Sequence, residues 1–519
     1  MTESSNNQLY YGDNLDILRR YVKDETVDLV YLDPPFNSNA NYNVLFAEKN
    51  GSQAASQIQA FTDTWTWNQE SESIFAEIVT AGGRVADCLQ AFRTFLGECD
   101  MLAYLVMMAP RLVELRRVMK PTGSIYLHCD PTASHYLKIL MDAVFGAGSF
   151  RNEIIWHYQR WPAKQKNFQR MHDVILFYVK AHRENTFNLL LESLSKGTLK
   201  RWKGKKSKVE YNGDVRLVTQ MTDEDSAGRP MDDVWDIPVI NSQARERLGY
   251  PTQKPVALLE RIISASSNPG DVVLDPFCGC GTTIAAAQAL GRPWIGIDIT
   301  HLAITLIKQR LKDSFGIEHA VRATPSGKGE TAKAAEAPAE YGGAAKRSFH
   351  VVGEPTSVLD AAALAASDPY QFQWWALGLV GARPVEQKKG ADKGIDGRII
   401  FQGEKTGSFE SVILSVKAGK SGSAHVRDLK GVLEREKAAI GVLISMQEPT
   451  SSMKTEAVTA GFYESAFWGR KYPKIQLLTV EELLTGKKVE MPPIRQVGAT
   501  FKKAPKVTEK QSGQSELQM

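Results

Sequence analysis

The chain has 519 residues, of which 43% are hydrophobic and 24% charged, and this is the composition of folded protein with room for two or three domains. The net charge is only +4, so a surface that binds nucleic acid must come from local clustering of basic residues. The five cysteines contain no Cys-x-x-Cys pair, and no apolar run is long enough to cross a membrane. We therefore expect a cytoplasmic protein without a zinc site, a disulfide framework or a membrane partner.

The first predicted strand, residues 8–11, breaks at Gly12, and the spacing of residues 15–22 predicts a helix with Asn14 as its cap. Residues 27–32 form an apolar run that predicts a buried strand of a parallel sheet. This strand stops at Asp33, because Pro34 and Pro35 cannot continue it. An acid, a rigid turn and the aromatic Phe36 therefore stand at the carboxyl end of a strand, where open α/β sheets bind ligands.

The chemistry that suits this turn is attack by an exocyclic amino group of a base. The Asp33 carboxylate and the Pro34 carbonyl could accept its two N–H bonds, and Phe36 could stack on a base flipped out of the duplex. Asp33-Pro34-Pro35-Phe36 resembles the catalytic motif of the amino-directed DNA methyltransferases, which act on adenine N6 or cytosine N4. The resemblance assigns these four residues to catalysis, and it places Asp13, the acid of the early Gly-Asp, near the cofactor adenine.

Helical spacing over residues 92–119 predicts one long helix, followed by a strand at 124–128 and a helix at 135–145. This alternation predicts a parallel sheet covered by helices on both faces. His128 ends a strand, but a lone histidine there is more often packed than functional, and we assign it no role.

Basic residues accumulate between about 159 and 245, and the stretch 196–208 contains no acid. Aromatic residues interleave with the basic ones, and this combination is typical of nucleic-acid contact. A solvated charged loop is the alternative. We predict an inserted target-recognition region that contacts double-stranded DNA through Lys200, Arg201, Lys203, Lys205 and Lys206.

Thr252-Gln253-Lys254-Pro255 is similar to the segment that cradles the methionine part of S-adenosylmethionine in the same family, with Lys254 on the cofactor carboxylate. A predicted strand then ends at Asp275 in a glycine-rich turn, and residues 294–298 form a strand that ends at Asp298. An acid about 20 residues after such a turn suits ribose hydroxyls. The resemblance implies S-adenosylmethionine held by Asp13, Lys254, Pro255, Asp275, Phe277, Gly279, Gly281, Thr282 and Asp298.

The catalytic motif precedes the cofactor motif, which is the order of the beta group of these enzymes. We predict a Rossmann-like methyltransferase domain over residues 1–320, a flexible linker over 321–348, a further α/β domain over 349–490 and a polar tail over 491–519.

Gly394-Ile395-Asp396-Gly397, followed by Ser415-Val416-Lys417, is similar to the core of Mrr-type restriction endonucleases of the PD-(D/E)xK class. The resemblance makes Asp396 a magnesium ligand and Lys417 the residue that polarises the attacking water. Ser415 departs from the pattern, since the family has Glu or Gln there, and Asp392 and Glu386 are the acids that could compensate. An inactive domain that grips DNA is the alternative.

Together the motifs predict a site-specific DNA methyltransferase of a restriction-modification system that acts on adenine N6, with direct attack and no covalent intermediate. Cytosine N4, a bifunctional enzyme that also cuts unmodified DNA with Mg, and an RNA or small-molecule substrate remain as alternatives. The family is often dimeric, so a homodimer is one expected assembly.

Overall fold

The computed structural model describes residues 7–35, 66–161, 164, 166–212, 215–241, 244–250, 252–319, 348–385, 394–402, 409–465, 469–492 and 504–507. Phe36, Glu386 and Asp392, together with most of the predicted linker and tail, lie outside these ranges.

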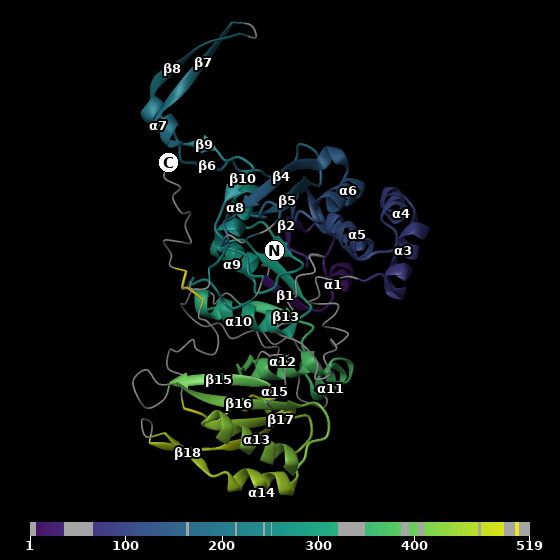
Figure 1. The fold of residues 1–519 in the computed structure, drawn as a ribbon, viewed down its shortest axis with the longest axis vertical. Coiled ribbons are helices and arrows are strands. Elements are labelled where there is room, and N and C mark those ends of the chain that lie inside the picture. Colours follow the sequence, from purple (N-terminus) through teal and green to yellow (C-terminus); the bar gives the residue numbers. More distant parts are fainter. Residues whose placement is uncertain are drawn as a thin grey trace, which may run out of the picture.

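A nine-stranded sheet forms the first domain, in the order β10-β4-β5-β3-β2-β11-β12-β1-β13 (Figure 1). Its strands are β1 (Asn7–Tyr11), β2 (Val27–Leu32), β3 (Met119–Cys129), β4 (Phe150–His157), β5 (His172–Val179), β10 (Val234–Asp236), β11 (Val273–Asp275), β12 (Trp294–Asp298) and β13 (Phe349–Val352). Every residue of β2 is buried, as its apolar run predicts for a central strand.

The structure differs from the predicted parallel sheet at one strand, β5. β5 pairs antiparallel with both of its neighbours, β3 and β4. The reason lies in the connection, because β4 returns to β5 through residues 158–171 without a crossover helix, and parallel neighbours need one.

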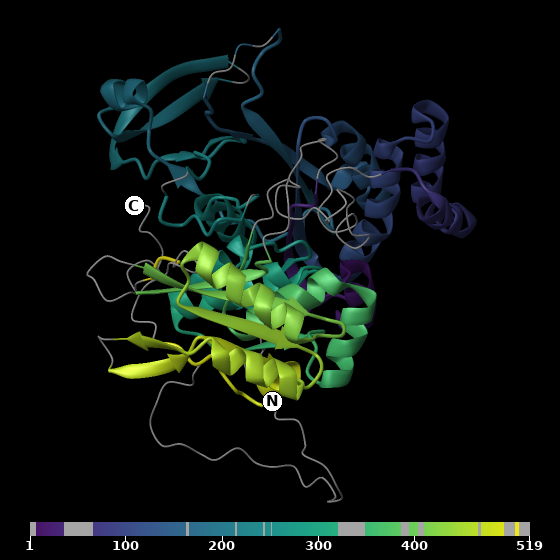
Figure 2. The same cartoon turned by 60° about the horizontal axis from the view of Figure 1, so that its bottom comes forward.

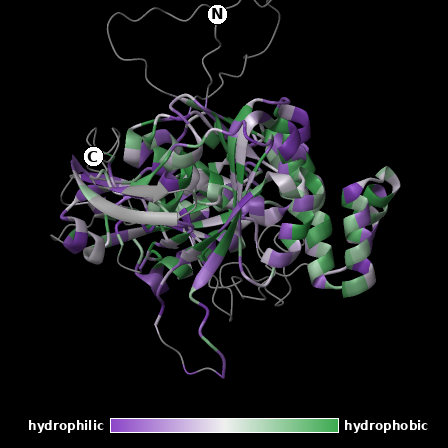
Figure 3. Ribbon diagram, turned by 90° about the horizontal axis from the view of Figure 1, so that it is seen from above, coloured by the Kyte–Doolittle hydropathy of each residue, from purple (hydrophilic) through white to green (hydrophobic). Residues whose placement is uncertain are grey.

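Two layers of helices cover the sheet. One face packs against α1 (Asn14–Tyr21), α5 (Asp100–Val118) and α6 (Ser134–Phe145), with the short 3-10 helix η2 (Ala147–Ser149) after α6. Two further helices, α3 (Gln69–Ala81) and α4 (Arg84–Leu96), pack against α5 and α6. The other face packs against α8 (Val256–Ser266), α9 (Thr282–Ala289) and α10 (His301–Phe315). Hydrophobic residues, drawn in green, run along much of the helices packed against the sheet, and α3 and α4 stand at the side of the domain (Figures 1 and 3).

Two local predictions are corrected. The single helix expected over 92–119 is two helices, because Gly97 ends α4 at a φ of 71° and α5 begins anew at Asp100. The cap of α1 is Asp13 and not Asn14, since the Asp13 carboxylate accepts from the N–H groups of Leu15 and Asp16.

The basic insertion contains two core strands, β5 and β10, and its remaining part lies between them. This part consists of β6 (Leu191–Glu192), α7 (Lys196–Trp202), the long hairpin β7 (Lys205–Asn212) and β8 (Val215–Asp225), and β9 (Arg229–Pro230). The hairpin and α7 project from the body of the molecule (Figure 1).

A second, five-stranded sheet follows the order β14-β15-β16-β17-β20, with bounds Arg383–Pro384, Gly397–Gln402, Phe409–Lys417, Ile440–Ser445 and Ile475–Thr479. One face packs against α11 (Val358–Ser367), α12 (Pro369–Leu379) and α15 (Val480–Leu484), and the other against α13 (Ser423–Glu436) and α14 (Ser451–Thr459). β18 (Phe462–Ser465) and β19 (Arg470–Pro473) form a separate hairpin. Figure 2 brings this domain to the front.

The two domains meet in sequence at β13. We expected the second domain to begin at residue 349, but β13 pairs with β1 at the edge of the first sheet, so the chain leaves that sheet only after Val352. In the part of the chain described here, no helix is long and apolar enough to span a bilayer.

Candidate active site

The residues of the two predicted motifs lie at the carboxyl ends of adjacent parallel strands. β11 pairs with β2 on one side and with β12 on the other. Asp33 directly follows β2, Asp275 ends β11 and Asp298 ends β12. The charges of Asp33 and Asp298 both act on the carboxyl group of Asp275, so the three acids share one edge of the sheet.

Asp275 is the most deeply buried of these acids, with 3% of its surface exposed. Burial is the largest of the effects that raise its pKa to about 7, hydrogen bonds from the Thr283 side chain and the Phe277 N–H oppose the rise, and the charges of Asp33 and Asp298 add to it. The Phe277 N–H donates to Asp275 Oδ1 over 3.0 Å. Asp275 therefore organises the turn that follows it, and its contact with the cofactor amino group stays a prediction.

Asp298 holds the same turn from the neighbouring strand. Its Oδ2 accepts from the Gly279 N–H over 2.8 Å, and its Oδ1 accepts from the Thr300 N–H and hydroxyl over 2.9 and 2.8 Å. Burial raises its pKa to about 6 despite these hydrogen bonds. Its role on the ribose hydroxyls likewise stays a prediction.

The glycines of the turn have packing reasons that sequence reasoning did not find. Gly281 has a φ of +73°, and a Cβ there would lie 2.7 Å from Ile307 Cγ1 of α10. Gly279 has a φ of +49°, and a Cβ there would lie 3.2 Å from the Tyr250 ring. The resemblance assigns both glycines to the cofactor, and that role stays a prediction. Thr282 is buried, and its hydroxyl accepts from Arg310 over 3.2 Å.

Asp13 is tied to the cofactor motif through its neighbour. Asp13 Oδ2 forms an ion pair with Arg111 over 2.5 Å. The Asn14 side chain donates to the Pro276 carbonyl over 2.9 Å and accepts from Arg111 over 2.6 Å. The early Gly-Asp and the second motif are therefore joined, although 262 residues separate Asn14 from Pro276.

Lys254 lies against the catalytic motif. Its Nζ forms an ion pair with Oδ2 of Asp33, and both side chains are about 15% exposed (15% and 16%). Pro255 caps α8. This contact shows that Lys254 reaches the acid that follows β2. The predicted role of Lys254 on the cofactor carboxylate stays a prediction.

The described residues fit S-adenosylmethionine in charge. This cofactor carries a sulfonium and an ammonium group, and Asp33, Asp275 and Asp298 give the edge of the sheet an acidic character that suits a cation.

One residue to which we assigned no role from the sequence borders this site. His128 at the end of β3 is fully buried, and it lies between Tyr31 of β2 and Asp173 of β5. A histidine at a strand end was the available signal, but its partners became visible only with the order of the strands.

The five basic residues predicted to bind DNA fall into two groups. Lys205 and Lys206 begin β7, and each forms an ion pair across the hairpin, with Asp225 over 2.7 Å and with Glu224 over 2.8 Å. Lys200, Arg201 and Lys203 lie in the last turn of α7 or directly after it, and their side chains are exposed.

In the second domain, the carboxylate of Asp396 is engaged at the position of the predicted metal. Asp396 Oδ2 accepts from the Ser415 hydroxyl over 3.2 Å and from the Val416 N–H over 2.7 Å. Lys417 ends the same strand, β16. Among the described residues, no group of three or more metal-ligating side chains gathers.

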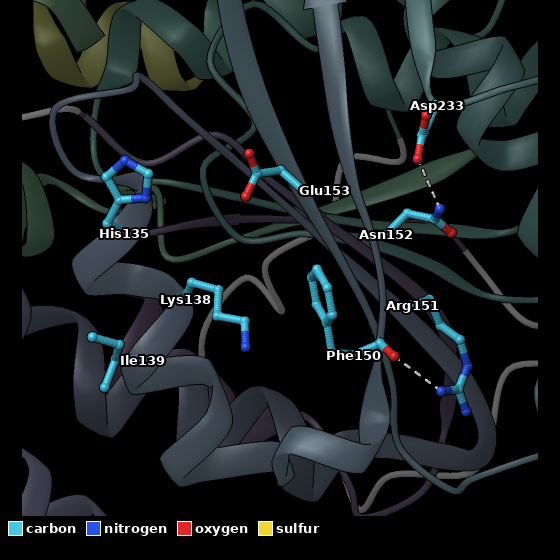
Figure 4. A pocket seen from close by; sticks show the side chains of 8 residues that line it. All are labelled: His135, Lys138, Ile139, Phe150, Arg151, Asn152, Glu153 and Asp233. Carbon is cyan, nitrogen blue, oxygen red and sulfur yellow. Dashed lines mark hydrogen bonds between the residues drawn. The ribbon is translucent and has the colours of Figure 1, made fainter.

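A hollow of about 570 Å³ lies elsewhere, between α6 and the first residues of β4 (Figure 4). Its lining consists of His135, Lys138, Ile139, Phe150, Arg151, Asn152, Glu153 and Asp233. None of the predicted site residues takes part in it.

Comparison with known proteins identifies the first domain. The model of the N6_N4_Mtase family, described as DNA methylase, matches residues 27–309, more than half of the chain, and the chain belongs to this family. The model described as NACHT-associated inactive Restriction Endonuclease 1 matches residues 371–485.

Among curated relatives, the type II methyltransferase M.HpaI of Haemophilus parainfluenzae is 34% identical over 204 residues, which are 39% of this chain and 58% of the relative. M.BamHI of Bacillus amyloliquefaciens is 30% identical over 59% of this chain and 57% of its own length. The chain thus spans less than two thirds of both. The DNA adenine methyltransferase YhdJ of Escherichia coli K12 is 28% identical over 58% of this chain and 82% of the relative.

Among solved structures, the cytosine-N4-specific PvuII DNA methyltransferase shares 14% identity over 58% of this chain and 86% of its own, with a TM-score of 0.34. This value is too low to carry an argument about substrate.

Proposed function

We propose that this protein transfers a methyl group from S-adenosylmethionine to an exocyclic amino group of a DNA base, with adenine N6 as the proposed target, as the modification enzyme of a restriction-modification or related system. The observation that carries the proposal is the meeting of Asp33, Asp275 and Asp298 at the carboxyl ends of three adjacent strands. The cofactor supplies an electrophilic methyl group. The chain supplies acceptors for the amino N–H bonds, at Asp33 and the Pro34 carbonyl, and Phe36 is proposed to stack on the flipped base.

Asp33→Ala tests the role of the catalytic acid. The variant should transfer methyl at least 100-fold more slowly than the wild type, because the amino nitrogen loses the acceptor that draws it toward tetrahedral geometry. Cofactor binding, measured by calorimetry, should persist. Asp24→Ala, at a surface carboxylate 71% exposed, is the matched control and should retain activity. Undiminished methylation by Asp33→Ala ends the proposal.

The choice of adenine over cytosine is supported by the resemblance to YhdJ, whose name specifies adenine. DNA from a host that expresses the protein, hydrolysed and analysed by mass spectrometry, should contain N6-methyladenine. If N4-methylcytosine is found in its place, the target is the cytosine amino group and the proposed roles of the residues stay the same. Sequencing with detection of modified bases then gives the recognised site.

For the second domain we propose a role in holding DNA without cutting it. The support is that Ser415 stands where the resembled endonucleases have Glu or Gln, that it donates to Asp396, and that the matching family is described as inactive. Purified protein with Mg should leave unmethylated DNA intact. Cleavage that disappears in Lys417→Ala would favour the bifunctional alternative.

A further inference from the structure

His128 forms the centre of a buried polar chain that the proposed reaction has not yet used. Its side chain is 0% exposed, at the end of β3. Its Nδ1 lies 2.9 Å from the Tyr31 hydroxyl and 3.9 Å from Asp33 Oδ1, while its Nε2 lies 3.2 Å from Asp173 Oδ2. The Trp156 ring packs edge-on against the imidazole at 5.4 Å. The histidine is thus held between two carboxylates, one of which is the proposed catalytic acid.

Asp173 is suited to support a positive charge on this histidine. Burial alone would raise the pKa of Asp173, but the hydrogen bond and charge of His128, with the charge of Lys254, outweigh burial and hold the pKa below its usual value. The Tyr158 hydroxyl donates to Asp173 Oδ1 over 3.0 Å. A carboxylate on one ring nitrogen orients the imidazole and leaves the other nitrogen directed at its target.

The two oxygens of Asp33 face different groups. Oδ2 is engaged by Lys254, and Oδ1 is the oxygen near His128. The Tyr31 hydroxyl stays neutral, because burial, with the charges of Asp33, Asp275 and Asp173, raises its pKa well above the usual value. A contact of 3.9 Å needs a shift of about 1 Å to reach hydrogen-bond range, and catalytic contacts of this kind often tighten only in the reacting complex.

We propose that the Asp173–His128 pair receives, through Asp33, the proton that the base amino group releases on methylation. This inference rests on the proposed function. The amino nitrogen forms a bond to the methyl carbon, and the S–CH₃ bond breaks with its electron pair going to sulfur. The nitrogen then carries a positive charge, and one N–H bond breaks as an O–H bond forms at Asp33 Oδ1. That O–H bond breaks as an N–H bond forms at His128 Nδ1, and the imidazolium faces the ionised Asp173.

Between turnovers, once the methylated base has left, the Nδ1 proton passes back to Asp33, which is 16% exposed, and from Asp33 to solvent. His128 is thereby returned to its neutral form with the Nε2 proton toward Asp173, and Asp33 to its carboxylate form. His128 acts through Asp33, so it is a positioning and proton-accepting partner and does not touch the base.

Two amide substitutions separate proton uptake from simple packing. His128→Asn keeps a polar atom near the position of Nδ1, facing Tyr31 and Asp33, and His128→Gln keeps one near Nε2, facing Asp173. Neither amide can take up a proton. Single-turnover methyl transfer at saturating cofactor and DNA should fall about 100-fold or more in both, within the usual range for acid–base partners. Dissociation constants for cofactor and DNA should stay within about threefold of the wild type.

The rate against pH supplies a readout that a packing role would not move. The profile of the wild type should differ from those of both amide variants, because only the wild type carries a group that takes up a proton at this position. The titratable and charged groups facing His128 include Tyr31 of β2, Asp33 directly after β2, and Asp173 of β5. Tyr158 and Lys254 act on it through Asp173. The titrations of Asp275 and Asp298 are common to all variants and cancel in the comparison.

Asp173→Asn serves as a second variant if the histidine variants fold poorly. Asp173 is partly exposed, so its substitution should disturb folding less than that of the fully buried His128. It should slow transfer about tenfold or more, since an amide stabilises an imidazolium less than a carboxylate does. If His128→Asn restores wild-type rates, His128 only holds Asp33 in place and the inference is wrong. An unchanged rate in Asp173→Asn also overturns it. A wild type that methylates no DNA overturns the proposed function first, and this inference with it.

Discussion

The raised pKa of Asp275 makes the folding stability of the protein depend on pH. Its pKa of about 7 lies above the value near 3.9 of an unfolded aspartate, and that of Asp298, about 6, is displaced the same way. A folded state that raises the pKa of an acid favours the protonated form, so this contribution to stability is fully present below about pH 4 and is lost as the pH rises through 6 to 7. Burial of these carboxyl groups therefore costs the folded state stability at neutral pH, where they are charged.

Two measurements check this. Thermal unfolding of the protein without cofactor should occur at a higher temperature at pH 5.5 than at pH 8, and Asp275→Asn should flatten the difference because it removes one titrating group. The affinity for S-adenosylmethionine should change in the opposite sense and increase from pH 5.5 to pH 8, since a cation binds more tightly to ionised carboxylates. A melting temperature that rises steadily from pH 5.5 to pH 8 would contradict the assignment.

At the scale of elements, the insertion divides its basic residues by their neighbours. Two acids of β8, Asp225 and Glu224, form ion pairs with Lys205 and Lys206. The hydrogen bonds from these lysines lower the pKa values of both acids. The sequence stretch 196–208 has no acid, but the hairpin brings 223–225 alongside it. Within the described residues, α7 and Lys203 present exposed basic side chains that are not part of these ion pairs across the hairpin.

The double variant Lys200→Ala/Arg201→Ala should weaken binding to DNA of any sequence about equally and reduce the slope of log affinity against log salt by about 2, one for each lost phosphate contact. The matched control is Lys205→Ala/Lys206→Ala, which removes two ion pairs within the hairpin and should change the slope by less than half as much. Fluorescence anisotropy at several salt concentrations gives both slopes. Equal slopes for the two double variants would place the DNA contact elsewhere.

Elements were predictable from the sequence where a local pattern decides them. The buried strand β2 and the strand β12 at 294–298 follow from apolar runs, and the structure has them at these bounds. The antiparallel β5, the partner of Lys254 and the surroundings of His128 depend on contacts between distant residues. Lys254 and Asp33 are 221 residues apart, and no local pattern records such a pair.

At the scale of the whole molecule, the second domain contacts the elements that carry the proposed cofactor site. The His301 N–H at the start of α10, three residues after Asp298, donates to the Gln371 side chain of α12 over 3.0 Å. The backbone of Gly249, close to Lys254 in sequence, lies near the guanidinium of Arg383 in β14. The second domain is therefore placed to support both flanks of the site, and weakening the contact between the domains should loosen the site.

Gly378 is the position where this coupling can be tested by one methyl group. A Cβ at Gly378 of α12 would lie 2.7 Å from Thr305 Oγ1 of α10, so Gly378→Ala forces the Thr305 side chain or the packing of the two helices to shift, and we expect a cost of about 1 to 3 kcal/mol. Calorimetry should show a lower melting temperature with the unfolding of the two domains separated, and a weaker affinity for cofactor.

Gly431→Ala in α13 is the matched control, because nothing lies within 4 Å of a Cβ there and alanine favours the helix by about 1 kcal/mol. Adding Thr305→Ala to Gly378→Ala removes the clashing hydroxyl and should restore both the melting temperature and the affinity. If Gly378→Ala melts like Gly431→Ala, or if it lowers stability while cofactor affinity stays unchanged, the second domain does not support the site through this contact.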